Sequence, residues 1–207
     1  MPRRFVRELL DPVGEELRLV RDRIAESVEA KQALLAGDEP DRAARLADMI
    51  AESLRAGGKV LLFGNGGSAA DATHLAAEFV GRFKLERAPL PALSLTDNVS
   101  AISAIGNDYA FEEVFARQVE AFGRPGDVAI GLSTSGTSEN VLAGLRKAAE
   151  LELRTAAFTG ASGASLPDEV ELCLRMPSED TARIQECYLL LGHVVCELVE
   201  QALFVPR

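Results

Sequence analysis

The chain has 207 residues, with 22 Lys and Arg against 32 Asp and Glu, which gives a formal net charge of −10. This length fits a single domain, and the negative field repels nucleic acid. Hydrophobic residues at 47% and charged residues at 26% are typical of a soluble globular protein. No stretch approaches the ~18 consecutive apolar residues that span a membrane. The three cysteines lack close pairs, which indicates reduced thiols. We therefore expect a cytoplasmic protein that binds neither nucleic acid nor membrane.

Helices come first along the chain, and strands follow. Apolar residues recur at helical spacing from residue 5 to about 36, and a second helix is predicted over 41–55. Short apolar runs then predict buried strands at 59–63, 91–95, 127–132, 155–158 and 170–174. Further helices are predicted at about 68–83, 98–121, 138–150 and 181–203. Strands that alternate with helices form βαβ units, so we expect a parallel sheet covered on both faces.

A glycine-rich loop, residues 64–68 (GNGGS), connects the first strand to the next helix. Ligands of open α/β sheets bind at the carboxyl ends of strands, and the free N–H groups of a helix start favour anions. The same residues satisfy the dinucleotide pattern Gly64-x-Gly66-x-x-Ala69, with Asp97 available to hold a ribose. This loop alone leaves both interpretations open.

A second loop, residues 133–138 (STSGTS), also lies between a strand and a helix. It offers five hydroxyl groups around one glycine, and hydroxyl and backbone donors together suit a phosphate monoester. The alternative is that these residues only cap the following helix. One or two hydroxyls are enough for a cap, so we expect a phosphate site.

The two histidines of the chain lie in separate helical segments. His74 and Glu78 stand four residues apart and share one helix face, while Gln185 and His193 lie on the last helix. A Glu and a His can supply the base and the acid that interconvert an aldose and a ketose. The same four side chains could hold a divalent metal such as zinc. Residues eight apart on a helix lie ~12 Å apart along its axis, so one metal ion reaches both only if the side chains lean inward or a neighbouring molecule contributes.

Four motifs stand out in this order: GNGGSAADATHLAAEFVGRF, TDNVSAISAIGNDYAFEEVFARQ, STSGTSENV and ARIQECYLLLGHVVCELVEQALF. Together they resemble the phosphoheptose isomerases of the sugar isomerase (SIS) domain superfamily, over nearly the whole chain. The resemblance implies a three-layer α/β/α sandwich with a five-stranded parallel sheet of the SIS, flavodoxin-like type, preceded by N-terminal helices. It implies one SIS domain over residues 1–207, in which residues 1–56 contribute to oligomer packing and residues 57–207 form the α/β core.

The family also implies an activity. Its members convert sedoheptulose 7-phosphate into D-glycero-D-manno-heptose 7-phosphate, and they are typically homotetramers that bind zinc. By resemblance, Glu78 is the general base and His193 the general acid of an enediol mechanism. The implied ligands of one Zn²⁺ per subunit are His74, Glu78, Gln185 and His193. The implied substrate contacts, near subunit interfaces, are Asn65, Gly66, Gly67, Ser68, Glu78, Arg82, Asn107, Asp108, Ser133, Thr134, Ser135, Ser138 and Gln185.

Two departures and three alternatives qualify this expectation. Some members carry an aspartate where this chain has Ala182, and Asp180 is the available substitute. Some also carry a second histidine where this chain has Tyr188. A non-catalytic sister group, which binds the bacterial replication initiator, has the same fold but lacks the catalytic pair that Glu78 and His193 represent here. An isomerase of another phosphorylated sugar remains open. A dinucleotide oxidoreductase leaves the second loop unexplained.

Overall fold

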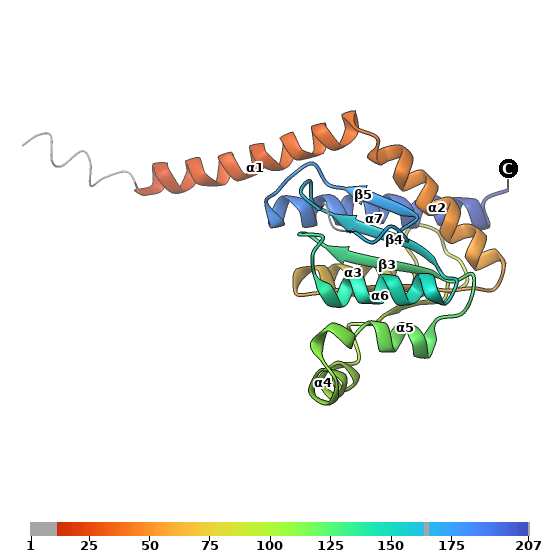
Figure 1. Cartoon of the computed structure of the whole chain (residues 1–207). Coiled ribbons are helices and arrows are strands. Elements are labelled where there is room, and N and C mark those ends of the chain that lie inside the picture. The colour runs from red at the N-terminus through yellow and green to blue at the C-terminus, as the bar shows by residue number, and fades with distance from the viewer. Residues whose placement is uncertain (1–11, 164–165, 207) are drawn as a thin grey trace, which may run out of the picture.

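A five-stranded parallel sheet forms the centre of the computed structural model, which describes residues 12–163 and 166–206 (Figure 1). The strands are β1 (Val60–Gly64), β2 (Ala92–Ser94), β3 (Val128–Ser133), β4 (Arg154–Thr159) and β5 (Leu172–Arg175). Their order is β2-β1-β3-β4-β5, and every neighbouring pair is parallel. The predicted sheet is confirmed, with strand ends that differ from the prediction by one or two residues.

Helices cover both faces of this sheet, which confirms the three-layer sandwich (Figure 1). One face carries α2 (Glu39–Arg55), α3 (Gly67–Val80) and α7 (Thr181–Phe204). The other carries α5 (Ala116–Phe122) and α6 (Glu139–Glu150), with the 3-10 helix η1 (Phe111–Glu113) and α4 (Val99–Asp108) beside them. The remaining helix, α1 (Pro12–Ala36), extends away from the sheet.

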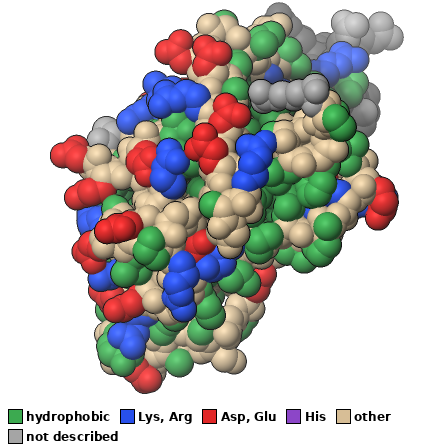
Figure 2. Space-filling view, turned by 90° about the vertical axis from the view of Figure 1, so that its right-hand side faces the viewer, with side chains coloured by type: hydrophobic (Ala, Val, Ile, Leu, Met, Phe, Trp, Pro, Cys, Tyr) green, Lys and Arg blue, Asp and Glu red, His purple; other side chains and the backbone are tan. Residues whose placement is uncertain are grey.

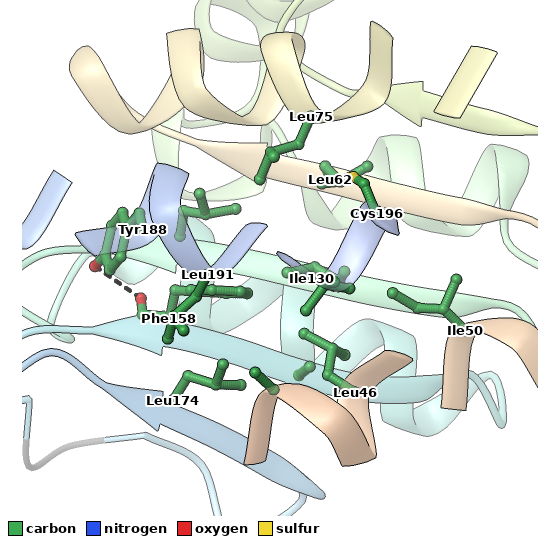
Figure 3. Packing of buried hydrophobic residues seen from close by; sticks show 14 of the residues in the cluster. Leu46, Ile50, Leu62, Leu75, Ile130, Phe158, Leu174, Tyr188, Leu191 and Cys196 are labelled. Atoms are coloured by element: carbon green, nitrogen blue, oxygen red, sulfur yellow. Dashed lines mark hydrogen bonds between the residues drawn. The ribbon is translucent and has the colours of Figure 1, made fainter. Parts of the chain in front are cut away.

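The strands bury side chains on both faces, which explains why they read as continuous apolar runs. Leu62 and Ile130 point into the core under α2, α3 and α7 (Figure 3), whereas Leu61 and Ala129 join the core on the other side. Tyr188 of α7 is fully buried in the first of these cores, and its hydroxyl donates to the Phe158 carbonyl at 2.9 Å (Figure 3). Tyr188 is therefore a structural residue that anchors α7 to β4.

The predicted continuous helix over 98–121 was wrong, because the chain breaks after Asp108 into α4, η1 and α5. Ala110 is extended, with φ −162° and ψ 157°. No described residue of α4 is buried, whereas Val114, Phe115 and Val119 pack into the second core. The break lets the chain turn back and bury these three side chains, which a straight helix could not do.

The N-terminal segment divides into two parts. Residues 5–11 of the first predicted helix lie outside the described residues. Helix α1 is anchored to α7 near its carboxyl end, where Ser27 donates to Glu186 at 2.5 Å and Leu34 joins the core. Helix α2 belongs fully to the layer over the sheet, since Leu46 and Ile50 are completely buried. The predicted boundary at residue 57 therefore falls within one packed unit, because α2, which precedes it, packs on the sheet that follows it.

Within the described part of the chain, α7 is the one helix with the length and hydropathy of a membrane span. Its apolar composition is that of a core helix, because it packs against α2 and α3 and 44% of its most apolar 18-residue stretch is buried. Figure 2 shows the side of the molecule that carries the C-terminus, and acidic and basic side chains are interspersed there. That face carries no continuous basic patch.

Candidate active site

The two predicted ligand loops lie beside each other at the carboxyl edge of the sheet. β1 and β3 are neighbours, with Gly64 paired to Leu132 at their ends. The strand order changes direction between these two strands, and ligands of open α/β sheets bind in the crevice outside such a switch point. The loops at 64–68 and 133–138 therefore flank the position where this fold binds ligands.

The hydroxyl groups of the second loop face one another. Ser133 Oγ lies 2.9 Å from Ser138 Oγ and 3.5 Å from Ser135 Oγ. Thr137 donates to Ser135 Oγ from its backbone N–H at 3.2 Å and its hydroxyl at 3.0 Å. Ser138 occupies the N-cap position of α6, but its side chain caps no helix N–H. This arrangement favours phosphate binding over simple capping.

Backbone contacts fix the shape of this loop. Gly136 has φ +68°, and a Cβ there would lie 2.7 Å from Gly163 Cα, so only glycine fits. The Thr134 carbonyl accepts a hydrogen bond from Gly160 N–H at 3.0 Å. The loop is thus held against the segment after β4 by its backbone.

His74, Glu78 and His193 form a compact cluster between α3 and α7. His74 Nε2 lies 2.8 Å from His193 Nε2 and 3.4 Å from Glu78 Oε1. One ring nitrogen in the histidine pair must donate a proton and the other accept it. The cluster can therefore hold and move a proton at these nitrogens.

Close packing of α7 on α3 creates the cluster. A Cβ at Gly192 would lie 2.5 Å from Leu75 Cδ2, so the absence of a side chain lets the helices approach. The His193 ring stacks on Phe83, with centroids 5.2 Å apart and planes at 16°. The His193 ring also contacts the His74 ring in an edge-to-face arrangement. These contacts fix the His193 ring where it faces Glu78.

The cluster also fits the zinc ion that the family resemblance implies. One ligand atom from each of the three residues lies within 4.8 Å of the others. Two imidazole nitrogens and a carboxylate oxygen are a common donor set for zinc, which each ligand holds at ~2 Å. The fourth predicted ligand, Gln185, has its amide against Gly67, where a Cβ would lie 2.3 Å from Gln185 Nε2. The structure therefore brings three of the four predicted ligands together and places Gln185 beside the glycine-rich loop.

Three predicted substrate residues lie apart from the cluster. Arg82 pairs with Glu86 (Nε to Oε2, 3.4 Å), and its side chain is 57% exposed. Asn107 donates to Asp108 at 2.8 Å at the exposed end of α4, beside the opposite face of the sheet. No contact among the described residues joins these side chains to His74, so their predicted roles stay predictions. Asp180, the substitute for the aspartate missing at Ala182, caps α7 by accepting from two backbone N–H groups.

Sequence reasoning missed two residues near the site. Asp71 lies one turn before His74, is 8% exposed, and its Oδ2 accepts no hydrogen bond within the described residues. Burial raises the pKa of Asp71, and nearby His74 lowers it in part. Asn140 pairs its amide with that of Asn65 beyond the end of β1. The available signals were a second acid beside Glu78 in an alanine-rich helix and an amide two residues after the loop at 133–138.

Comparisons with known proteins agree with this fold. The SIS domain family matches residues 23–160. The phosphoheptose isomerase of Roseiflexus sp. (strain RS-1) is 54% identical over 193 residues, which cover 93% of this chain and 98% of the relative. That of Geobacter sulfurreducens is 50% identical over 196 residues, which cover 95% of this chain and all of the relative.

Solved structures give the same answer. A phosphoheptose isomerase structure from Neisseria gonorrhoeae superposes with a TM-score of 0.82 at 41% identity, over 89% of this chain and 98% of that one. One from Francisella tularensis gives a TM-score of 0.85 at 37% identity, over 90% and 98% of the two chains. The chain therefore belongs to the phosphoheptose isomerases of the SIS domain family, which are phosphosugar isomerase enzymes.

Proposed function

We propose that this enzyme converts sedoheptulose 7-phosphate into D-glycero-D-manno-heptose 7-phosphate in the cytoplasm. The observation that carries the proposal is the cluster formed by His74 and Glu78, on the helix that begins at the glycine-rich loop, and His193 of α7. About 10 Å of helix separates Gly67 from His74, at 1.5 Å per residue. A seven-carbon sugar phosphate has its phosphate at one end of the carbon chain and its carbonyl chemistry at the other, which suits a site with two separated parts.

The proposed chemistry uses residues of this chain as base and acid. The Glu78 carboxylate removes a proton from C1 of the ketose, and the His193 imidazole donates a proton to the carbonyl oxygen at C2. The resulting enediol collapses when the hydroxyl proton at O1 returns to His193 and the carbon-bound proton returns from Glu78 to C2. Each residue ends in its starting state, so no net proton is consumed.

Substrate anchoring is assigned to the two loops. Ser133, Thr134, Ser135 and Ser138 hold the phosphate, and residues 65–68 line the sugar pocket with Gln185 beside them. The predicted contacts of Arg82, Asn107 and Asp108 belong to this proposal. Hydrogen bonds to a phosphate are charge-assisted and therefore stronger than ordinary ones.

The proposal includes one zinc ion per subunit, held by His74, Glu78 and His193 with Gln185 as a fourth ligand. When bound, zinc supplies Lewis-acid polarisation of the substrate carbonyl. Zinc binding and proton transfer compete for the same His193 nitrogen, because Nε2 is the atom that faces His74. Activity with and without a chelator decides which role dominates.

We also propose a homotetramer with active sites near the subunit interfaces, with residues 1–56 contributing to oligomer packing. The support is an apolar stripe on α1, spaced by three or four residues and between 48% and 59% exposed: Leu17, Val20, Ile24 and Val28. Helices bury such stripes against a partner. Sedimentation should give a mass of about four chains of 22.1 kDa. The mass of a single chain would contradict this part of the proposal.

The deciding experiment assays purified enzyme on sedoheptulose 7-phosphate beside hexose and pentose phosphates, each with and without chelator. We expect turnover of the heptose phosphate. Turnover of another sugar alone identifies a different phosphosugar isomerase. Absence of turnover on every sugar, combined with tight binding of the replication initiator, favours the non-catalytic alternative and overturns the proposal.

A further inference from the structure

Asn65 and Asn140 form a reciprocal amide pair beyond the carboxyl ends of β1 and β3. Asn65 Nδ2 donates to Asn140 Oδ1 at 2.8 Å, and Asn140 Nδ2 donates to Asn65 Oδ1 at 2.9 Å. Asn65 is the first residue after β1, and Asn140 is the second residue of α6. The pair therefore joins the two ligand loops across 75 residues of sequence.

A backbone hydrogen bond decides which way both amides face. Asn140 Oδ1 also accepts from the Val141 N–H at 3.0 Å, a donor that it shares with the Ser138 carbonyl at 2.9 Å, and a backbone N–H can only donate. The atom of Asn140 that faces Val141 must therefore be oxygen. Its amide nitrogen then faces Asn65 Oδ1, which in turn fixes the nitrogen of Asn65 toward Asn140. Neither amide can flip without losing hydrogen bonds.

The pair leaves part of the Asn65 amide free. An asparagine amide has two N–H hydrogens and two oxygen lone pairs. Asn140 uses one hydrogen and one lone pair of Asn65, and no other side-chain bond of Asn65 exists among the described residues. Asn140 is 2% exposed, whereas Asn65 is only half-buried. The remaining donor and acceptor of Asn65 are thus the ones available to a ligand.

The free N–H and the free oxygen lone pair point to opposite sides of the Asn65 amide, so each can bind a hydroxyl group of its own. A hydroxyl both donates and accepts, whereas an ionised phosphate oxygen only accepts. We propose, on the basis of the proposed function, that Asn140 is a positioning residue that orients Asn65 to bind a hydroxyl of the substrate near its phosphate-bearing carbon. Asn140 itself does not contact the substrate. It acts by holding the Asn65 amide in one orientation beside the hydroxyl loop.

The role of Asn140 is remote from the reacting carbons, so its loss weakens ground state and transition state alike. Such a change raises KM and leaves kcat nearly constant. We expect Asn140→Ala to raise KM about tenfold, the effect of about one lost hydrogen bond. Asn65→Ala should have a similar effect, and the double variant should be no worse than Asn65→Ala alone, because both substitutions remove one interaction.

Gln118 provides a matched structural control. It is a buried amide at 4% exposure whose two hydrogen bonds both go to backbone carbonyls, those of Leu95 and Val114. Gln118→Ala should lower the melting temperature without raising KM. A purely structural role for Asn140 predicts the same outcome for Asn140→Ala.

The test measures kcat, KM and the Kd for sedoheptulose 7-phosphate in the wild type, both single variants, the double variant and Gln118→Ala. A raised KM and Kd with constant kcat, non-additive with Asn65→Ala, supports the positioning role. Unchanged KM and Kd in Asn140→Ala, or additive losses in the double variant, overturn it. If the wild type binds the sugar without turnover, the proposed function fails, and the Kd values alone decide the role of Asn140. If the wild type shows neither binding nor turnover, both proposals fail.

Discussion

Helix α7 contacts α3 at one place and the segment after α3 at another. Polar side chains are fully hydrogen-bonded at one of these places and only partly at the other. At one place, Arg87 and Glu200 have side chains that are each 1% exposed, and Glu200 accepts from three backbone N–H groups as well as from Arg87. At the other, His74 is half exposed and Asp71 keeps a buried oxygen without a partner. Helix α7 therefore packs against a saturated polar cluster at one place and an unsaturated one at the other. Polar groups whose hydrogen bonds are all made within the protein stabilise the fold. Polar groups with unused hydrogen-bonding atoms can still bind a ligand.

The saturated cluster supports the unsaturated one. Arg87 also donates to the backbone carbonyls of Glu78 and Phe79 at 2.8 Å. It thereby fixes the end of α3, where Glu78 faces the histidines. The segment that Glu200 holds includes Phe83, which stacks on His193. Substitutions in the saturated cluster should thus lower stability and also disturb the positions of Glu78 and His193.

The largest expected effect is on catalysis. Glu78→Gln and His193→Gln should each lower kcat for sedoheptulose 7-phosphate by about 10²- to 10⁴-fold, because each removes a proton-transfer group. Steady-state kinetics measures kcat, and circular dichroism checks that the fold is intact. The matched control is Glu150→Gln, at the exposed carboxyl end of α6, which should leave kcat unchanged. A variant of Glu78 or His193 with near wild-type kcat contradicts the mechanism.

Arg87→Ala should give the largest loss of stability. The substitution leaves the Glu200 carboxylate buried without its charged partner, which typically costs about 3–5 kcal/mol. Urea unfolding measures this free energy. Arg146→Ala breaks the exposed ion pair with Glu139 (2.7 Å) and should cost less than ~1 kcal/mol. Equal losses in the two variants would remove the distinction between a saturated cluster and an ordinary surface pair.

The hydroxyl loop should affect substrate binding. Ser135→Ala combined with Ser138→Ala should raise KM for the phosphorylated sugar at least about tenfold, since two hydroxyl donors to the phosphate are lost. Ser103→Ala, on the exposed helix α4, is the control. Unchanged kcat and KM in the double variant would exclude the loop from phosphate binding.

The smallest expected effect is a pH-dependent gain of stability in Asp71→Asn. Burial raises the folded pKa of Asp71 above its ordinary value of 3.8, with His74 lowering it in part. The contribution of Asp71 to stability is therefore present below pH 3.8 and is lost as pH rises through the folded pKa. Asp71→Asn removes this loss, so its free energy of unfolding should exceed that of the wild type by about 1 kcal/mol near pH 7 and by less near pH 4. A gain that is equal at both pH values contradicts the account.

Glu200→Gln should change the pH dependence of stability in the opposite direction. Burial alone raises the pKa of Glu200, but the backbone N–H groups of Leu85, Phe83 and Lys84, together with Arg87, bring it below the ordinary 4.5. Its contribution to stability is present above pH 4.5 and is lost as pH falls through the folded pKa. Glu200→Gln should therefore destabilise the protein most near pH 7. A stabilising effect there would contradict the comparison of the two clusters.

The sequence predicts the sheet better than the site. Buried strands such as β3 carry apolar residues toward both faces, so local composition identifies them. The break after Asp108 is not local, since it depends on where Val114 and Phe115 find the second core. Local patterns therefore identify elements more reliably than they identify chain reversals.

Within the site, helical spacing alone places His74 and Glu78 together. The approach of His193 depends on Gly192 packing against Leu75, a contact between distant segments that periodicity does not predict. The resemblance supplied the role of His193 but not this contact. Asn140 was missed for the same reason. Its partner Asn65 lies 75 residues away, and nothing in the pattern around either residue indicates the pairing.

The most direct test of the central claim follows hydrogen at the reacting carbons. Wild-type enzyme and Glu78→Gln are each incubated with sedoheptulose 7-phosphate in D₂O, and deuterium at C2 of the product is measured by NMR. The Glu78 side chain is 21% exposed, so a proton held there can exchange with solvent. The account predicts deuterated product from the wild type and neither product nor exchange from the variant. Deuterated product from Glu78→Gln at the wild-type rate would contradict it.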